Sequence, residues 1–319
     1  MEFYNYQMPE GSVLPDALKT QNGWLDPLVL SPKGPHHRTL VLLHGRGSNA
    51  FSFGSALLAM KLSPTSLTLP ETFPDAEFIF PTAKLRRSAA LKRARIAQWF
   101  DNFSLEDPDE RQGAQHEGLH ESAEFIHKII LQEAGLVGTQ NVILGGLSQG
   151  SAMGLHVLMS FQSSHERSLG GFFGMSGWLP FSKQLAAISE GKDPESTDIA
   201  EDADENGEDE NPFDDEKPNE NAITSLAARA IHFIRQDVLD FPDTREKYDT
   251  VTVPIFLGHG ELDEKVSVNL GKNAADTMTK LGWIVTWKSY SGLAHWHSPE
   301  ELEDVARFVK EFGDNARAE

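Results

Sequence analysis

The sequence feature that most constrains this chain is a serine held between two glycines after a short apolar run. Residues 142–145 have the composition of a buried strand, and residues 152–159 have helical spacing. Gly146 and Gly150 allow a sharp turn between them, because a side chain at either position would collide with the adjoining strand or helix. The pattern predicts a strained Ser148 at the tip of the turn. Its hydroxyl should be exposed, and the free N–H groups of the following helix should point at it.

A Gly-x-Ser-x-Gly pattern also arises by chance, as a glycine-rich turn with an idle serine. The strand and helix on either side favour the catalytic interpretation. A serine hydroxyl is a weak nucleophile at neutral pH unless an imidazole takes its proton and a carboxylate orients that imidazole. The catalytic interpretation therefore requires a base, an acid and an oxyanion hole elsewhere in the chain.

Composition sets the class of protein. The 319 residues, 39% of them apolar, suit one large α/β domain, and we predict a single domain over 1–319. The absence of cysteine excludes disulfides, thiolate zinc sites and cysteine nucleophiles. No signal peptide is visible, and no apolar stretch approaches the roughly 20 residues of a membrane span. A cytoplasmic protein without a transmembrane segment is expected.

The net charge of −20 is concentrated in one segment. Residues 190–220 contain 15 acidic residues and 2 lysines, so this segment carries −13 of the total. It has no apolar face, which predicts a disordered acidic insertion, with an acidic interaction segment as the alternative. Acidity of this kind argues against nucleic-acid binding.

Apolar runs that read as strands alternate with amphipathic stretches that read as helices. Strands are expected near 28–30, 39–43, 78–80, 142–145, 171–175, 253–257 and 283–287. Helices are expected near 50–62, 118–134, 152–159, 222–239, 270–281 and 302–312. This alternation predicts an α/β fold with a mostly parallel central sheet and helices on both faces. Reactive groups collect at the carboxyl ends of the strands in such sheets.

The acid is expected in the loop after the strand at 253–257. Asp263 is the only aspartate of that loop and lies deepest before the next helix, with Glu261 and Glu264 as its rivals. Asp263 would alternatively be the N-cap of an element that starts near Val266. Serine, then acid, then histidine is the chain order of α/β-hydrolase triads.

The base is expected in the loop before the last helix. His295 follows small residues that would let its ring reach inward, and His297 is its rival two residues later. The sequence from His297 onward reads as the lead into the helix, with Ser298 as cap and Pro299 in the first turn. We therefore predict that His295 is the base.

An oxyanion hole needs two backbone donors. One should be the N–H of Gln149, directly after the nucleophile, and the other the N–H of Arg46 in the loop after the strand at 39–43. The His44 side chain is expected to be structural.

No metal site is predicted. His116 and His120 lie one helical turn apart, but no further ligand accompanies them at convincing spacing. The basic run from Lys84 to Arg95 is expected to be a solvated face, with attraction to an anionic lipid surface or an acidic substrate as the alternative.

Several motifs occur together in one order. They are Leu42-Leu43-His44-Gly45-Arg46-Gly47-Ser48, Gln98-Trp99-Phe100-Asp101, Gly145-Gly146-Leu147-Ser148-Gln149-Gly150-Ser151-Ala152, Gly258-His259-Gly260 with Asp263, and Gly292-Leu293-Ala294-His295. In this combination the chain resembles the acyl-protein thioesterase and phospholipase/carboxylesterase family of α/β-hydrolases, from about Thr39 to Phe312 apart from 190–220.

The resemblance implies a cofactor-free serine hydrolase that cleaves thioesters or esters. Its substrate would be an acylated protein, a lysophospholipid or a small ester, with transient contact with a membrane surface. It implies that Ser148, Asp263 and His295 form the triad and that Arg46 and Gln149 supply the oxyanion amides. We also expect substrate-binding contacts from Trp99, Leu43 and Trp178.

The chain departs from the family pattern in three places. Glu264 follows Asp263 where the family usually has proline, the segment after Pro81 is basic, and the acidic insertion is extra. These differences concern acyl-chain specificity. The alternatives are a broad short-chain carboxylesterase and an inactive hydrolase fold that binds a partner through the acidic insertion.

Overall fold

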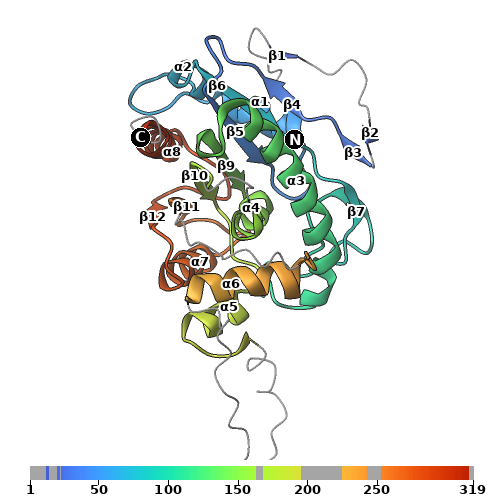
Figure 1. Ribbon diagram of the computed structural model, residues 1–319. Coiled ribbons are helices and arrows are strands. Elements are labelled where there is room, and N and C mark those ends of the chain that lie inside the picture. The colour runs from blue at the N-terminus through green and yellow to red at the C-terminus, as the bar shows by residue number, and fades with distance from the viewer. Residues whose placement is uncertain are drawn as a thin grey trace, which may run out of the picture.

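The fold of the described residues is built around one central β-sheet. The computed structural model describes residues 12–13, 20–21, 23–162, 168–194, 225–242 and 253–315. Within these residues one eight-stranded sheet runs in the order β1-β4-β6-β5-β9-β10-β11-β12 (Figure 1). Its strands are β1 Ser12–Val13, β4 Leu28–Leu30, β5 Arg38–Leu43, β6 Ala76–Phe80, β9 Val142–Leu147, β10 Gly171–Met175, β11 Ile255–Gly260 and β12 Val285–Tyr290.

The strand directions confirm the predicted sheet. The strands from β6 through β12 in this order are parallel, and β4 and β1 add an antiparallel edge. Parallel strands bring their carboxyl ends to the same edge of the sheet, so the loops after β5, β9, β11 and β12 meet there.

Helices cover both faces of the sheet (Figure 1). They are α1 Ala50–Ala59, α2 Leu69–Thr72, α3 His116–Val137, α4 Gln149–Ser160, α5 Ser182–Ser189, α6 Leu226–Phe233, α7 Val268–Lys280 and α8 Pro299–Asn315. The apolar residues of α1, α2 and α8 belong to one core, and those of α3 to α7 belong to another. The predicted α/β-hydrolase fold is therefore present.

Strand β5 shows why a continuous apolar run is needed. Val41 and Leu43 pack into the core under α3 and α4, whereas Leu40 and Leu42 pack into the core under α1 and α8. Successive side chains of a strand point to opposite faces. The part of the strand that is covered by helices on both faces, residues 40–43, is therefore apolar at each position.

Two segments have details that the sequence pattern does not specify. The basic run, for which we expected a solvated face, is mostly exposed and contains a hairpin of β7 Leu85–Arg87 and β8 Arg95–Ala97, which pair antiparallel. The helix expected over 222–239 begins at Leu226, where Ser225 accepts a hydrogen bond from the Ala228 N–H, and it continues as a π-helical turn, Ile234–Val238.

The acidic insertion expected over 190–220 lies mostly outside the described residues, which stop at 194 and resume at 225. In the described part of the chain, no helix is long and apolar enough to cross a membrane.

Candidate active site

The turn at Ser148 has the geometry that its glycines predict. Ser148 has φ 57° and ψ −121°, between the end of β9 and the start of α4. A non-glycine residue in such a conformation costs on the order of 1–3 kcal/mol. A Cβ at Gly146 would lie 2.4 Å from the Gly150 carbonyl carbon, and one at Gly150 would lie 2.1 Å from the Leu43 carbonyl oxygen. Only glycine fits at both positions.

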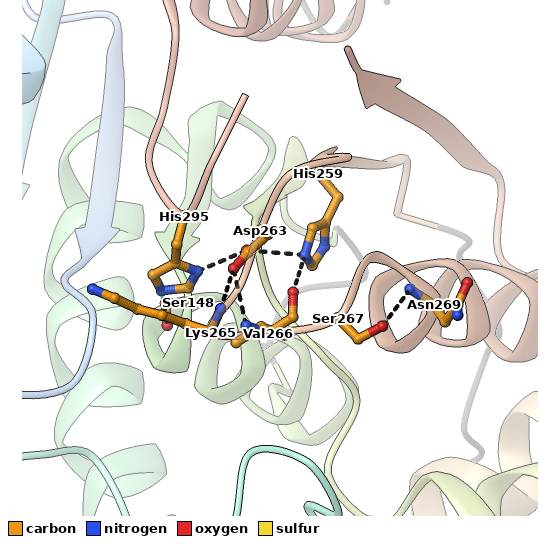
Figure 2. Close-up of polar contacts among 8 residues, drawn as sticks. All are labelled: Ser148, His259, Asp263, Lys265, Val266, Ser267, Asn269 and His295. Carbon is orange, nitrogen blue, oxygen red and sulfur yellow. Dashed lines mark hydrogen bonds and ion pairs between the residues drawn. The ribbon is translucent and has the colours of Figure 1, made fainter. Parts of the chain in front are cut away.

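Ser148 is largely buried, whereas we expected its hydroxyl to be exposed at the tip of the turn. Ser148 is only 7% exposed. Its Oγ lies 2.9 Å from Nε2 of His295, and the two residues lie side by side in Figure 2. The His295 side chain is 14% exposed. The imidazole therefore lies within hydrogen-bond distance of the hydroxyl, as a base that takes its proton must.

His295 connects the hydroxyl to a carboxylate. Its Nδ1 lies 2.7 Å from Oδ2 of Asp263. The loop after β12 carries His295 and the loop after β11 carries Asp263, so two neighbouring strand ends bring them together. The rival His297 lies elsewhere: its Nδ1 is 3.3 Å from the Met60 sulfur.

Asp263 is a buried carboxylate with four hydrogen-bond donors. Oδ1 accepts from the backbone N–H groups of Lys265 and Val266, each at 2.9 Å. Oδ2 faces His295 at 2.7 Å and Nε2 of His259 at 3.1 Å. Burial alone would raise the pKa of Asp263, but the hydrogen bonds from the two histidines and from the Val266 N–H, together with the charge of His295, hold its pKa well below the usual range.

The structure does not favour the alternatives considered for the acid, namely a helix N-cap role for Asp263 or Glu261 or Glu264 as the acid. The N-cap of α7 is Ser267, whose side chain accepts from the Asn269 N–H, so Asp263 caps only the preceding turn. Glu261 accepts a hydrogen bond from the Ser289 hydroxyl at the surface, and Glu264 is exposed.

His259 was not predicted to be a site residue. It lies in β11, is fully buried, and contacts the same carboxylate oxygen as His295 (Figure 2). The sequence pattern could have indicated His259, because this residue lies between two glycines and four residues before Asp263.

The loop after β5 lies against Ser148. A Cβ at Gly45 would lie 3.3 Å from the Ser148 Cβ, so Gly45, the residue before Arg46, packs against Ser148. The next residue, Gly47, donates its N–H to the Ala97 carbonyl at 2.7 Å, and the Arg46 guanidinium donates to the Asn102 carbonyl at 3.0 Å. On the other side, Gln149 is the first residue of α4, so its N–H has no acceptor within the helix.

His44 holds this loop in place. Its Nδ1 donates to the Gly45 carbonyl at 2.8 Å, and its Nε2 accepts from the Ala83 N–H at 3.0 Å. Burial lowers the pKa of His44 to about 4, so the ring is neutral at pH 7.

The three expected substrate-binding residues do not line an open surface. Trp99 and Leu43 are 0% exposed and Trp178 is 2% exposed, and all three belong to the core under α3 and α4. The Trp99 indole N–H donates to the His44 carbonyl at 2.8 Å. These side chains are buried in the described structure, and their contact with a substrate stays a prediction.

One group in the described chain has donors close enough to share a metal ion. The ligand atoms of His36, Glu77 and Glu133 lie within 4.8 Å of one another. The Thr39 hydroxyl already joins His36 to Glu133, with both distances 2.9 Å. Thr39 and Glu77 lie near the starts of β5 and β6, at the opposite edge of the sheet from Ser148. His116 and His120 face the backbone carbonyls of Val238 and Leu239 instead of a shared site.

Comparison with known proteins assigns the family. A model of the family described as Phospholipase/Carboxylesterase matches residues 25–193 and 240–312. The chain belongs to the phospholipase/carboxylesterase family. The match includes the Ser148 turn, the Asp263 loop and the His295 loop.

Curated relatives of this family member span nearly the whole chain. Acyl-protein thioesterase 1 of Gibberella zeae is 26% identical and aligns over 91% of this chain and 96% of its own length. Acyl-protein thioesterase 1 of Saccharomyces cerevisiae is also 26% identical, over 86% and 93% of the two chains.

Solved structures share the fold. Acyl-protein thioesterase 2 of Zea mays has a TM-score of 0.59 and 22% identity, over 90% of this chain and 98% of its own. SOBER1 of Arabidopsis thaliana has a TM-score of 0.56 and 22% identity, over 86% and 98%. This phospholipase/carboxylesterase family member is a serine hydrolase of the ester and thioester class.

Proposed function

We propose that this serine hydrolase is an acyl-protein thioesterase that works through an acyl-enzyme on Ser148. The observation that carries the proposal is the chain of contacts from Ser148 Oγ to His295 Nε2 (2.9 Å) and from His295 Nδ1 to Asp263 Oδ2 (2.7 Å). The thioester preference is supported by the curated relatives, which are named acyl-protein thioesterase 1.

In the proposed reaction, His295 takes the Ser148 proton as the hydroxyl oxygen attacks the acyl carbonyl carbon. The N–H groups of Arg46 and Gln149 donate to the oxyanion of the tetrahedral intermediate. His295 then gives the proton to the departing thiolate or alkoxide. Asp263 remains ionised throughout and stabilises the imidazolium, which its lowered pKa favours.

Hydrolysis of the acyl-enzyme completes the cycle. His295 removes a proton from water as the water oxygen attacks the acyl carbon of the Ser148 ester. The bond to Ser148 Oγ then breaks, His295 returns the proton to this oxygen, and the fatty acid is released. Every step uses groups of the chain and water, so the mechanism requires no cofactor. Lysophospholipids and small esters would react by the same steps, with an alcohol as the leaving group.

We also propose that the protein is located in the cytoplasm and that residues 1–319 form a single domain.

We propose no catalytic role for the acidic insertion at 190–220. Deletion of 190–220 should leave hydrolysis largely unchanged. Loss of activity in a folded deletion variant would favour a functional role for the insertion.

The test is a substrate panel. S-palmitoyl and S-acetyl peptides, their serine-linked oxoesters and a lysophospholipid are compared by kcat/KM for wild type, Ser148→Ala and Ser189→Ala. The Ser189 hydroxyl donates to the Ala186 carbonyl within α5, and Ser189 serves as the matched control. The proposal expects long-chain thioesters to be the best substrates, with loss of activity in Ser148→Ala alone. A preference for short oxoesters would favour the broad carboxylesterase, and activity retained by Ser148→Ala would overturn the mechanism.

A further inference from the structure

We propose that His259 is a positioning residue of this site: a second imidazole that holds the Asp263 carboxylate in line with His295. The inference rests on the proposed function, because it concerns how the acid of that mechanism is oriented. Asp263 lies between the two rings, and both rings point at its carboxylate (Figure 2).

The contacts of His259 decide which nitrogen carries its proton. Nε2 lies 2.9 Å from the Val266 carbonyl oxygen and 3.1 Å from Asp263 Oδ2. Both atoms are acceptors, so Nε2 must carry the hydrogen: it is hydrogen-bonded to the Val266 carbonyl and lies within ion-pair distance of Asp263 Oδ2. Nδ1 is buried with no hydrogen-bond partner among the described residues. The tautomer with hydrogen on Nε2 leaves no buried donor unpaired.

Packing prevents the ring from turning away. His259 is 0% exposed, and a Cβ at Gly271 of α7 would lie only 2.3 Å from its Nδ1. The Trp287 ring packs nearby, with centroids 6.2 Å apart. The absence of a side chain at Gly271 is therefore what allows α7 to approach this ring.

The consequence for Asp263 is that each carboxylate oxygen has two donors. The backbone N–H groups of Lys265 and Val266 hold Oδ1, and the two histidines hold Oδ2. The hydrogen bond from His259 also contributes to keeping the pKa of Asp263 low. An ionised and correctly aimed carboxylate selects the His295 tautomer whose Nε2 is free to accept the Ser148 proton.

If His259 had a purely structural role, only its hydrogen bond to the Val266 carbonyl would matter. His259 would then hold the β11–α7 connection together, and any side chain that kept this connection would do. The positioning role additionally requires a donor directed at Asp263, so the two roles predict different effects for substitutions that do and do not provide one.

Three variants separate these roles. His259→Leu fills much of the space without a donor. His259→Gln offers an amide N–H close to the position of Nε2. Gly271→Ala keeps the imidazole but adds a methyl group against its Nδ1. The matched control is His127→Leu, which removes an imidazole whose Nε2 lies 3.3 Å from the Val157 carbonyl, away from Asp263.

The experiment measures kcat and KM for hydrolysis of a thioester peptide, normalised to active sites titrated with a fluorophosphonate. We expect kcat to fall roughly 10- to 100-fold in His259→Leu at unchanged KM, as for loss of a charge-assisted hydrogen bond. The kcat of Gly271→Ala should also be lower than that of wild type. His259→Gln should recover most of the kcat lost in His259→Leu, and the kcat of His127→Leu should equal that of wild type.

Proton NMR gives a readout that a structural role would not move. The His295 Nδ1 proton bonded to a carboxylate should resonate far downfield in wild type and in His259→Gln, and should shift or broaden in His259→Leu. Wild-type kcat in His259→Leu, or equal loss in the Leu and Gln variants with this resonance unchanged, would overturn the inference. A wild-type enzyme that is neither active nor labelled at Ser148 would instead refute the proposed function.

Discussion

The backbone N–H of Trp99 donates to Oε1 of the Gln149 side chain at 3.0 Å, and Nε2 of Gln149 donates to the Phe100 carbonyl at 2.8 Å. The Trp99 indole in turn donates to the His44 carbonyl. A single segment therefore ties the start of α4 to the loop that contains Arg46. These are the two places from which we propose that the oxyanion donors come.

Removal of this connection should impair catalysis more than binding. Gln149→Ala keeps the backbone N–H of residue 149 but releases the Trp99 segment. We expect kcat to fall roughly 10- to 100-fold with little change in KM, because a small displacement of an oxyanion donor weakens a bond made mainly in the transition state. Steady-state kinetics test this, with Gln184→Ala, which loses a side-chain bond to Gln112, as control. Wild-type kcat in Gln149→Ala would refute the connection.

Asp263→Asn should keep the fold but lose the correct tautomer of His295. The amide nitrogen can donate where the carboxylate only accepts, so the hydrogen on His295 is favoured at Nε2, where it blocks proton transfer from Ser148. We expect kcat to fall by roughly 10³- to 10⁴-fold. Pre-steady-state acylation rates measure the effect directly. A fall of less than tenfold would mean that another group serves as the acid.

Buried histidines should make the protein sensitive to mild acid. Burial lowers the pKa of His297 from 6.5 to about 4. Between these values the unfolded chain binds a proton that the folded chain does not, so folding stability is present above pH 6.5 and is lost as the pH falls toward 4. The slope is roughly 1.4 kcal/mol per pH unit for each such histidine.

Urea denaturation between pH 7 and pH 4.5 measures this slope. His297→Leu should show a shallower loss of unfolding free energy than wild type. An identical slope in the two proteins would contradict the burial argument.

The turn glycines should be intolerant of substitution. A Cβ at Gly150 would meet the Leu43 carbonyl at 2.1 Å, and backbone cannot move aside as a side chain can. Gly150→Ala should lower the free energy of unfolding by roughly 1–3 kcal/mol. Gly113→Ala, with no atom within 4 Å of the added carbon, should change it by less than about 0.5 kcal/mol. Equal denaturation midpoints for the two variants would contradict the packing described for the turn.

The sequence predicted secondary-structure elements correctly where burial of the element produces a local hydrophobic pattern. The strand expected at 171–175 is β10, because an apolar strand covered on both faces has a continuous signature. The last strand was expected at 283–287 but is Val285–Tyr290, because Lys288 and Ser289 pair with β11 despite being polar. The hairpin β7–β8 depends on pairing between two basic segments, which periodicity does not reveal.

The same distinction applies to the site. Chain order and loop position were enough to select Ser148, Asp263 and His295, which the structure brings into contact. The direction of a side chain is a tertiary property, so the burial of Trp99 and Trp178 could not be predicted. His259 was missed because a histidine within an apolar strand reads as core until the Asp263 loop folds back onto it.

The most direct test of the central claim is to find which residue a fluorophosphonate probe modifies. The protein is treated with the probe, digested, and the modified peptide identified by mass spectrometry for wild type, Ser148→Ala and His295→Ala. The account predicts one adduct on Ser148 in wild type, none in Ser148→Ala, and much slower labelling in His295→Ala. An unmodified wild-type protein, or an adduct on another residue that persists in Ser148→Ala, would contradict it.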